Sequence, residues 1–304
     1  FSGSGEDEDG TIVAYLWTSS IDGTLSTSAN FTVNDLPFGN HTITFMVKDN
    51  EGDWSDEETS WVDVRKTPEW SYDTGRSVRY VDYSADGEYM VAGSGASSSN
   101  NIYLFKPKDS DEYVWTYGVD DSQIRSVAIS ANGEYIAAGI VAQSSGNDNA
   151  VYLFGRDNNT PIWSYDFTYG DKIRSVVISE DGNYIFVGNT NNKVYLFSRT
   201  SNTPLWSYAT EDDIFVVDIS ADGSYMVAGG QEDVLYLFDV EGDLVWSYTT
   251  DHHIQSVAIS ADGQYLATGS SDNKLYVFDR ENSTPLWSYE VPYFVSSIEF
   301  SADG

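Results

Sequence analysis

The sequence contains no cysteine, which excludes a disulfide framework, a thiolate metal site and a cysteine nucleophile. Histidine is nearly as scarce, because three histidines in 304 residues leave few side chains that can act as general bases near neutral pH. No stretch approaches the roughly 18 consecutive apolar residues of a membrane-spanning helix. These absences exclude several common catalytic designs, and we expect no membrane insertion of this part of the chain.

Positive charge is also scarce. The chain has 15 Lys and Arg against 48 Asp and Glu, a net charge of −33 at pH 7. Such an acidic surface repels nucleic acid and anionic membranes, so we expect neither as a partner. It suits a medium in which salt or divalent cations screen the repulsion. The 40% of hydrophobic and 15% of aromatic residues are typical of a folded protein.

The first 64 residues have a different pattern from the rest. Alternating apolar and polar residues predict short strands over residues 11–18, 30–34, 41–48 and 59–64, with turn residues between them. Short strands at this spacing indicate a small antiparallel β-sandwich. We therefore expect a first domain at residues 1–64, followed by a short, stiff linker at residues 65–68.

This region resembles a PKD (polycystic kidney disease) domain of the archaeal and bacterial surface-protein type. The matching residues are Gly3-Ser4-Gly5, Asp9-Gly10, Tyr15, Trp17, Asp22-Gly23, Gly39, His41-Thr42, Asp49 and Gly52. The resemblance implies an Ig-like sandwich that acts as a spacer or adhesion module outside the cell. The first strand of the family is missing here, so we expect a piece of a longer protein, truncated at both ends.

Two acidic loops of this domain are expected at the same pole of the sandwich. Their carboxylates could hold Ca²⁺, which takes six to eight oxygen ligands. The predicted ligands are Asp7, Asp9, Asp49 and Asp53. The alternative is two solvated acidic turns without a metal. Apart from this Ca²⁺, we expect no cofactor.

A repeat occupies the rest of the chain. A Trp-Ser/Thr-Tyr triplet recurs every 40 to 48 residues, and each complete unit also carries Asp/Asn-Gly followed by tyrosine, and then Tyr-x-Phe. The triplets begin at Trp70, Trp115, Trp163, Trp206, Trp246 and Trp287. Four strands in about 43 residues are typical of one β-propeller blade, with Asp-Gly supplying the positive-φ residues of a tight hairpin.

The predicted fold is therefore all-β, with the sandwich followed by a β-propeller of four-stranded blades over residues 69–304. Five complete units are expected, with an incomplete ring. Their approximate ranges are 74–117, 118–165, 166–208, 209–248 and 249–289, with a partial unit at 290–304. Residues 68–72 have the pattern of a fourth strand that lacks the first three strands of its own unit.

The units resemble the WD40-like and PQQ-like propeller families. SVAISADGQYLATGSSDNKLYVFD is similar to the core of a WD40 blade, and LYVFDRENSTPLWSY is similar to a PQQ-type repeat that ends at its docking tryptophan. The Gly-His and Trp-Asp dipeptides of WD40 blades are absent, so the interaction sites of that family are not carried over.

One position of the first strand departs from the repeat. Its residues are Arg79, Arg125 and Arg174 in three successive units, followed by Phe215, Gln255 and Ser296. Propeller symmetry places the arginines in an arc near one mouth of the central channel, where guanidinium groups can bind an anion or a carboxylate. The alternative is that they neutralise nearby acids, namely Asp120, Asp121 and Asp171.

No catalytic, phosphate-binding or dinucleotide-binding motif is present. The tyrosines and tryptophans follow the repeat so strictly that we interpret them as core residues, and His252-His253 as part of a surface loop. We therefore predict a non-catalytic extracellular or cell-surface protein, in which the propeller binds a protein or a glycan. The alternative is the propeller of a secreted enzyme, a quinoprotein-like dehydrogenase or a hydrolase, whose catalytic part lies outside this sequence.

Overall fold

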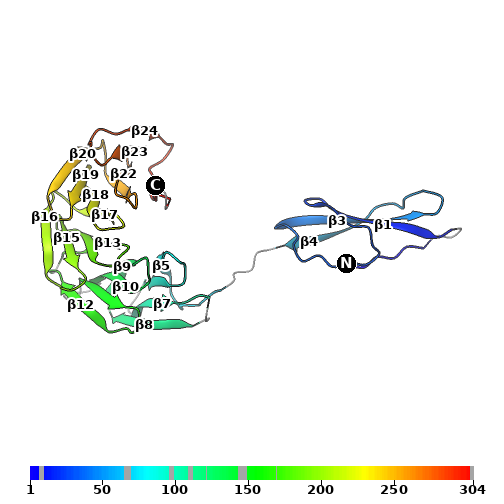
Figure 1. The fold of residues 1–304 in the computed structure, drawn as a ribbon, viewed down its shortest axis with the longest axis horizontal. Coiled ribbons are helices and arrows are strands. Elements are labelled where there is room, and N and C mark those ends of the chain that lie inside the picture. The colour runs from blue at the N-terminus through cyan, green and yellow to red at the C-terminus, as the bar shows by residue number, and fades with distance from the viewer. Residues whose placement is uncertain are drawn as a thin grey trace. The chain divides into compact units, whose positions relative to one another are not determined.

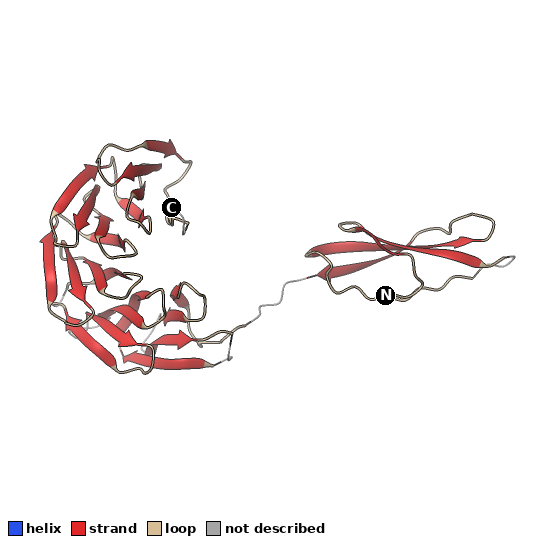
Figure 2. Cartoon of the chain, viewed as in Figure 1, coloured by secondary structure: helices blue, strands red, loops and turns tan. Residues whose placement is uncertain are grey.

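The computed structural model describes residues 1–6, 10–64, 70–95, 99–108, 112–120, 122–142, 149–168 and 170–301. The chain divides into two compact units, Phe1–Glu69 and Trp70–Gly304. The described residues form strands, turns and loops, and none of them belongs to a helix that could cross a membrane (Figure 2). The predicted linker at residues 65–68 lies outside the described residues.

The N-terminal unit contains one antiparallel sheet with the strand order β2-β1-β3-β4. Its strands are β1 (Ile12–Ser19), β2 (Gly23–Ser26), β3 (Gly39–Asp49) and β4 (Glu58–Val64). The strand predicted at residues 30–34 is wrong. Only Asn30 takes part in β pairing, through an isolated bridge to Ser2, whereas the sequence analysis did not anticipate β2.

A second layer covers this sheet, formed by the first residues of the chain and the segment around residue 30. Phe1 and Phe31 exchange backbone hydrogen bonds, and their rings stack at 5.1 Å. Trp17 and Phe45 lie against this layer from the sheet, with ring centroids 4.3 Å apart. A Cβ on Gly3 would lie 2.5 Å from the Phe45 ring, so only glycine lets the two layers approach this closely.

The described residues of the C-terminal unit form five four-stranded antiparallel sheets, each made of four consecutive strands, as predicted (Figure 1). We call these sheets blades 1 to 5. Blade 1 is β5 (Val78–Tyr83), β6 (Met90–Ser94), β7 (Ser99–Phe105) and β8 (Tyr113–Asp120). Blade 2 is β9 (Ser122–Ile129), β10 (Tyr135–Ala142), β11 (Ala150–Gly155) and β12 (Pro161–Asp166).

Blades 3 to 5 repeat the same plan. Blade 3 is β13 (Ile173–Ile178), β14 (Tyr184–Asn189), β15 (Lys193–Ser198) and β16 (Pro204–Ala209). Blade 4 is β17 (Ile214–Ile219), β18 (Tyr225–Gly230), β19 (Val234–Asp239) and β20 (Leu244–Thr249). Blade 5 is β21 (Ile254–Ile259), β22 (Tyr265–Ser270), β23 (Lys274–Asp279) and β24 (Trp287–Glu290).

The first strands of neighbouring blades contact one another on the inside of an arc, and the fourth strands lie on its outside (Figure 1). The arc is open, as the sequence analysis predicted. The second and third strands are buried on both faces between blades, which explains their nearly continuous apolar runs.

The turn between the first and second strands is built from serine, aspartate and glycine. In blade 1 the Ser84 hydroxyl donates to Asp86 at 2.6 Å and accepts the backbone N–H of Tyr89 at 2.9 Å. Gly87 has a φ of 64°, whereas Asp86 is not among the residues with positive φ. The prediction that both residues of Asp-Gly have positive φ is therefore wrong, because a turn closed by the Ser84 side chain needs only one such residue.

Neighbouring blades touch closely near the channel through a glycine of the second strand. A Cβ on Gly188 would lie 2.6 Å from Cγ2 of Ile214, the first residue of the next blade. Val295 takes the same position against Gly269, so residues 294–301 dock on blade 5 where the first strand of a sixth blade belongs. They form no strand, because none of the described strands pairs with them.

At the outer edge, the repeat tryptophans of blades 1 to 4 reach the next blade. Trp163 Nε1 donates to the backbone oxygen of Arg199 at 2.9 Å, and the Trp163 ring packs 5.5 Å from Phe197. The corresponding donors are Trp115 to Arg156, Trp206 to Val240 and Trp246 to Arg280. The five blades are thus joined in succession by four copies of the same contact.

Blade 1 receives an equivalent contact from the segment before it. Trp70 lies 4.9 Å and Tyr72 5.1 Å from the Phe105 ring, centroid to centroid. These distances resemble those of Trp163 and Tyr165 around Phe197, 5.5 and 5.1 Å. Residues 70–72 therefore pack where the fourth strand of a preceding blade would lie, although they form no strand themselves.

Candidate functional site

The first strand of every blade is interrupted by a β-bulge at an equivalent position of the repeat. It is the second residue of the strand in blades 1, 3, 4 and 5 and the fourth residue of the longer β9 in blade 2. In blade 3, Ile173 pairs with Asn189 and Ser175 pairs with Gly188, so that Arg174 has no opposite residue. The corresponding bulge residues of the other blades are Arg79, Arg125, Phe215 and Gln255. A bulge bends its strand and redirects a side chain, and bulges are common beside functional sites. The position that departs from the repeat is therefore also structurally distinct.

Four of the five bulge residues line one pocket of about 380 Å³. We call it the arginine pocket. Its lining residues are Arg125, Arg174, Phe215, Gln255 and, from blade 1, Tyr80. Each comes from the first strand of a different blade, so the pocket lies at the mouth of the central channel.

The structure separates Arg79 from the other two arginines of the predicted arc. Arg79 is exposed and does not line the pocket, and its neighbour Tyr80 takes that place. Arg125 is half-buried, whereas Arg174 is exposed and lies over the Phe215 ring with Cζ 5.3 Å from the centroid. Two arginines from adjacent blades therefore share the pocket, and the third is outside it.

The two arginines of the pocket form no ion pair with any acidic residue among those described. Asp171, one of the acids expected to neutralise them, accepts a hydrogen bond from Asn191 Nδ2 at 2.7 Å. Asp121 lies outside the described residues, as does the side chain of Asp120. Burial and the adjacent Asp212 raise the pKa of Asp213, and the positive charge of Arg174 partly opposes this shift. The positive charge of Arg174 therefore influences the pKa of Asp213, although Arg174 forms no ion pair with a described carboxylate.

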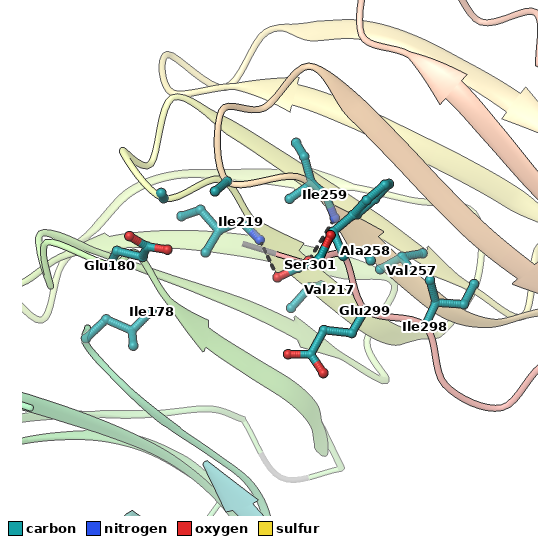
Figure 3. Close-up of a pocket in the computed structure, with 14 residues that line it drawn as sticks. Ile178, Glu180, Val217, Ile219, Val257, Ala258, Ile259, Ile298, Glu299 and Ser301 are labelled. Carbon is teal, nitrogen blue, oxygen red and sulfur yellow. Dashed lines mark hydrogen bonds between the residues drawn. The ribbon is translucent and has the colours of Figure 1, made fainter. Parts of the chain in front are cut away.

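A second pocket, of about 500 Å³, lies toward the other end of the first strands. We call it the aspartate pocket (Figure 3). Asp218 is in its wall, and Glu299 extends into it from the segment docked on blade 5. The Asp218 carboxylate accepts the backbone N–H of Ile219 at 2.9 Å and that of Ile259, on the next blade, at 2.9 Å. This aspartate therefore joins blades 4 and 5.

Burial raises the pKa of Asp218 to about 7, with smaller contributions from the negative charges of Glu299 and Asp82. The two backbone N–H groups oppose this rise because they stabilise the carboxylate. Asp82 makes the same contacts in blade 1, accepting from Tyr83 at 2.8 Å and from Ile129 of blade 2 at 2.9 Å.

The sequence analysis missed these aspartates. They occupy the position of the repeat three residues after the bulge residue, where blades 2, 3 and 5 have the small or apolar residues Ala128, Val177 and Ala258. Comparing the units at this position, as was done for the arginines, would have found them. Because both carboxylates are engaged by backbone N–H groups, their role is to fasten neighbouring blades.

The predicted calcium site is only partly within the described residues, since Asp7 and Asp9 lie outside them. Asp49 Oδ1 accepts the backbone N–H groups of Glu51, Gly52 and Asp53 at 2.7 to 2.9 Å, and these bonds lower the Asp49 pKa. Asp49 and Asp53 line a pocket of about 180 Å³ together with Glu6. The described residues contain no group of three or more metal-binding side chains, and the calcium site stays a prediction.

One of the three histidines is buried and the other two are exposed. His41 is buried in the N-terminal unit, with Nδ1 2.6 Å from Ser19 Oγ and Nε2 2.6 Å from the Pro37 carbonyl oxygen. Since a carbonyl only accepts, a neutral His41 carries its proton on Nε2 and accepts the Ser19 hydroxyl at Nδ1. This serine–histidine pair is shielded from solvent and holds a turn. His252 and His253 lie in an exposed bend, as the sequence analysis expected.

Five four-stranded sheets, each with its first strand at a common channel, define the class of β-propeller repeat proteins. A family model described as Outer membrane protein assembly factor BamB matches residues 147–300, slightly more than half of the chain. The chain belongs to that family, and the match confirms the PQQ-like character of its repeats. No curated protein matches the chain.

Proposed function

We propose that this chain is a non-catalytic binding protein, whose propeller binds a partner at the mouth of its channel. The observation that carries the proposal is the bulge position, where Arg125, Arg174, Phe215 and Gln255 gather in one pocket. These residues differ from blade to blade, whereas the tryptophan contact at the outer edge repeats between neighbouring blades. Residues that have no structural role repeated from blade to blade are available to bind a partner.

Two further observations favour binding over catalysis. The residues that line the arginine pocket include no histidine. The matching family is described as an assembly factor. A protein or a glycan is the partner class that we propose, at the cell surface or outside the cell. The N-terminal unit would act as a PKD-like spacer in this arrangement.

Arrays of purified proteins and of glycans, probed with the full chain, test this function. Partners retained by the chain are then measured again with Phe215→Ala, in the arginine pocket, and with Trp61→Ala. Trp61 is a matched control because it is an exposed aromatic residue of the N-terminal unit, with 76% of its surface accessible.

We expect Phe215→Ala to weaken binding by about tenfold or more, because it removes an aromatic contact and the support of Arg174. We expect Trp61→Ala to leave binding unchanged. Loss of binding with Trp61→Ala alone would assign the function to the N-terminal unit. Chemical conversion of a retained partner would contradict the non-catalytic role.

A further inference from the structure

We propose that the arginine pocket binds an acidic peptide segment of a partner protein, through two carboxylates held by Arg125 and Arg174. This inference rests on the proposed function and names the chemistry that the binding face recognises. A guanidinium group presents a planar fork of N–H donors that matches a carboxylate, and two such forks on adjacent blades match two carboxylates close together.

The state of the two arginines favours an external ligand. In a chain with a net charge of −33, these two arginines place positive charge together in one pocket. Neither Arg125 nor Arg174 has such a pair among the described residues. By contrast, Arg156, Arg199 and Arg280 stack on tyrosines of the preceding blade at 4.5 to 5.0 Å. Those three arginines have a repeated structural role, and the two in the pocket do not.

The remaining lining residues complete the pocket. Phe215 lies against the Arg174 guanidinium and offers an apolar surface beside the charge. Gln255 Nε2 donates to Ser271 Oγ at 3.0 Å, which fixes the amide, and its Oε1 can accept a peptide N–H. Tyr80 closes the side formed by blade 1. A concave site with charged, apolar and amide groups matches a peptide better than it matches a bare ion.

The surrounding charge favours carboxylates over doubly charged anions. Asp213 lies close enough to Arg174 for the two charges to interact. A phosphate or sulfate dianion at Arg174 would place two negative charges near this acid, whereas a peptide with two carboxylates places only one there and the other at Arg125. The pocket is also open, and Arg174 is exposed, so that a small free carboxylate would gain little from each contact. A peptide adds backbone and side-chain contacts along the mouth, and we therefore infer a segment of a protein.

Fluorescence anisotropy with the full chain tests the assignment. The probe is a short labelled peptide that carries two glutamates within three residues, and its counterpart carries glutamines in their place. Measurements near physiological salt reduce the influence of charges farther away than about 8 Å. We expect the glutamate peptide to bind, and the glutamine peptide and free succinate to bind at least about tenfold more weakly.

Variants locate the site. Arg125→Gln and Arg174→Gln should each weaken the glutamate peptide about tenfold, and Arg125→Lys nearly as much, because lysine keeps the charge but not the fork. Arg79→Gln is the matched control, since it removes the same side chain from the same bulge position outside the pocket. It should leave the affinity unchanged. Thermal unfolding of each variant verifies that it is folded.

Several results would overturn the proposal. Equal weakening by Arg79→Gln would show attraction by overall charge, and succinate binding as tightly as the peptide would show a small-molecule site. Unchanged peptide affinity in Arg125→Gln and Arg174→Gln, with lowered melting temperatures, would assign these arginines to stability. If the array partners still bind while the glutamate peptide does not, the binding function stands and only this ligand assignment fails.

Discussion

The outer and inner edges of the propeller differ in how strictly their residues repeat from blade to blade. At the outer edge, the same tryptophan-to-carbonyl hydrogen bond joins four pairs of neighbouring blades, at 2.7 to 2.9 Å. At the inner edge, the bulge residue is arginine, phenylalanine or glutamine in different blades. A contact that recurs at every interface holds the fold together, whereas a position that varies under the same backbone geometry is available for recognition.

The largest effect expected from this comparison concerns the aromatic core between blades. Phe197 is fully buried beside Trp163 and Tyr165. We expect Phe197→Ala to lower the free energy of unfolding by about 3–5 kcal/mol, through lost burial and an unfilled cavity. Urea denaturation measures the change. Phe294→Ala is the control, because Phe294 is 57% exposed, and a comparable loss there would contradict the contrast between repeated core and periphery.

A smaller loss is expected where two blades approach most closely. A Cβ on Gly188 would lie 2.6 Å from Ile214 and 2.9 Å from Val217. Gly188→Ala should therefore cost about 1–3 kcal/mol, as overpacking of a close interface does. At Gly155 the nearest atom to an added Cβ is 3.8 Å away, so Gly155→Ala should be neutral or slightly stabilising. Equal effects in denaturant titrations of the two variants would refute the close approach.

The Asp218 carboxyl should make stability depend on pH. Its raised pKa of about 7 means that the folded chain keeps a proton that the unfolded chain releases near pH 4. The resulting stabilisation is complete below the ordinary pKa and is lost as the pH rises through 7. Relative to the native protein, Asp218→Asn should gain roughly 1–3 kcal/mol in unfolding free energy between pH 4 and 8.

Denaturant titrations at several pH values measure this difference. Asp262 provides the control with the opposite sign, because the Ser260 hydroxyl lowers its pKa. Its contribution is present above the ordinary pKa and is lost only as the pH falls below it. Asp262→Asn should therefore change the pH dependence only in the acidic range. A constant difference between Asp218→Asn and the native protein would contradict the assigned titration.

The smallest of the expected effects concerns the outer edge itself. Trp163→Phe keeps an aromatic ring against Phe197 but removes the hydrogen bond to the Arg199 carbonyl. We expect a loss of about 1 kcal/mol, the usual net contribution of one hydrogen bond. Trp287, which is 50% exposed, provides the control, since Trp287→Phe should change the melting temperature little. A similar loss of stability in both variants would mean that the hydrogen bond between blades does not contribute to the stability of the fold.

The repeat predicted the blades well because its period reflects local patterning. Alternating apolar runs, the Asp-Gly turn and the tryptophan recur along the chain, and the five sheets follow them. The bulge could not be predicted in the same way. It is a shift in pairing between two strands, set by which residue of the second strand lies opposite, and a single strand does not encode that choice.

The limits of the prediction differ in the N-terminal unit. Residues 30–34 alternate like a strand, yet their neighbours in space are the first residues of the chain, which offer a single bridge.

At the candidate site, the sequence grouped Arg79 with Arg125 and Arg174 because their positions in the repeat are equivalent. In the structure only Arg125 and Arg174 line the pocket, and Tyr80 lines it from blade 1, because equivalence along the chain does not decide which side chain of a strand reaches the pocket.

The packing of Trp70 and Tyr72 on blade 1 has a consequence for the order of folding. This pair comes from a segment shortly before β5 and packs on Phe105 of β7, so that the contact closes a loop of about 33 residues and requires no strand of a later blade. During synthesis from the N-terminus, blade 1 can cover this face before any later blade exists. It thus provides a finished template on which blades 2 to 5 assemble in turn.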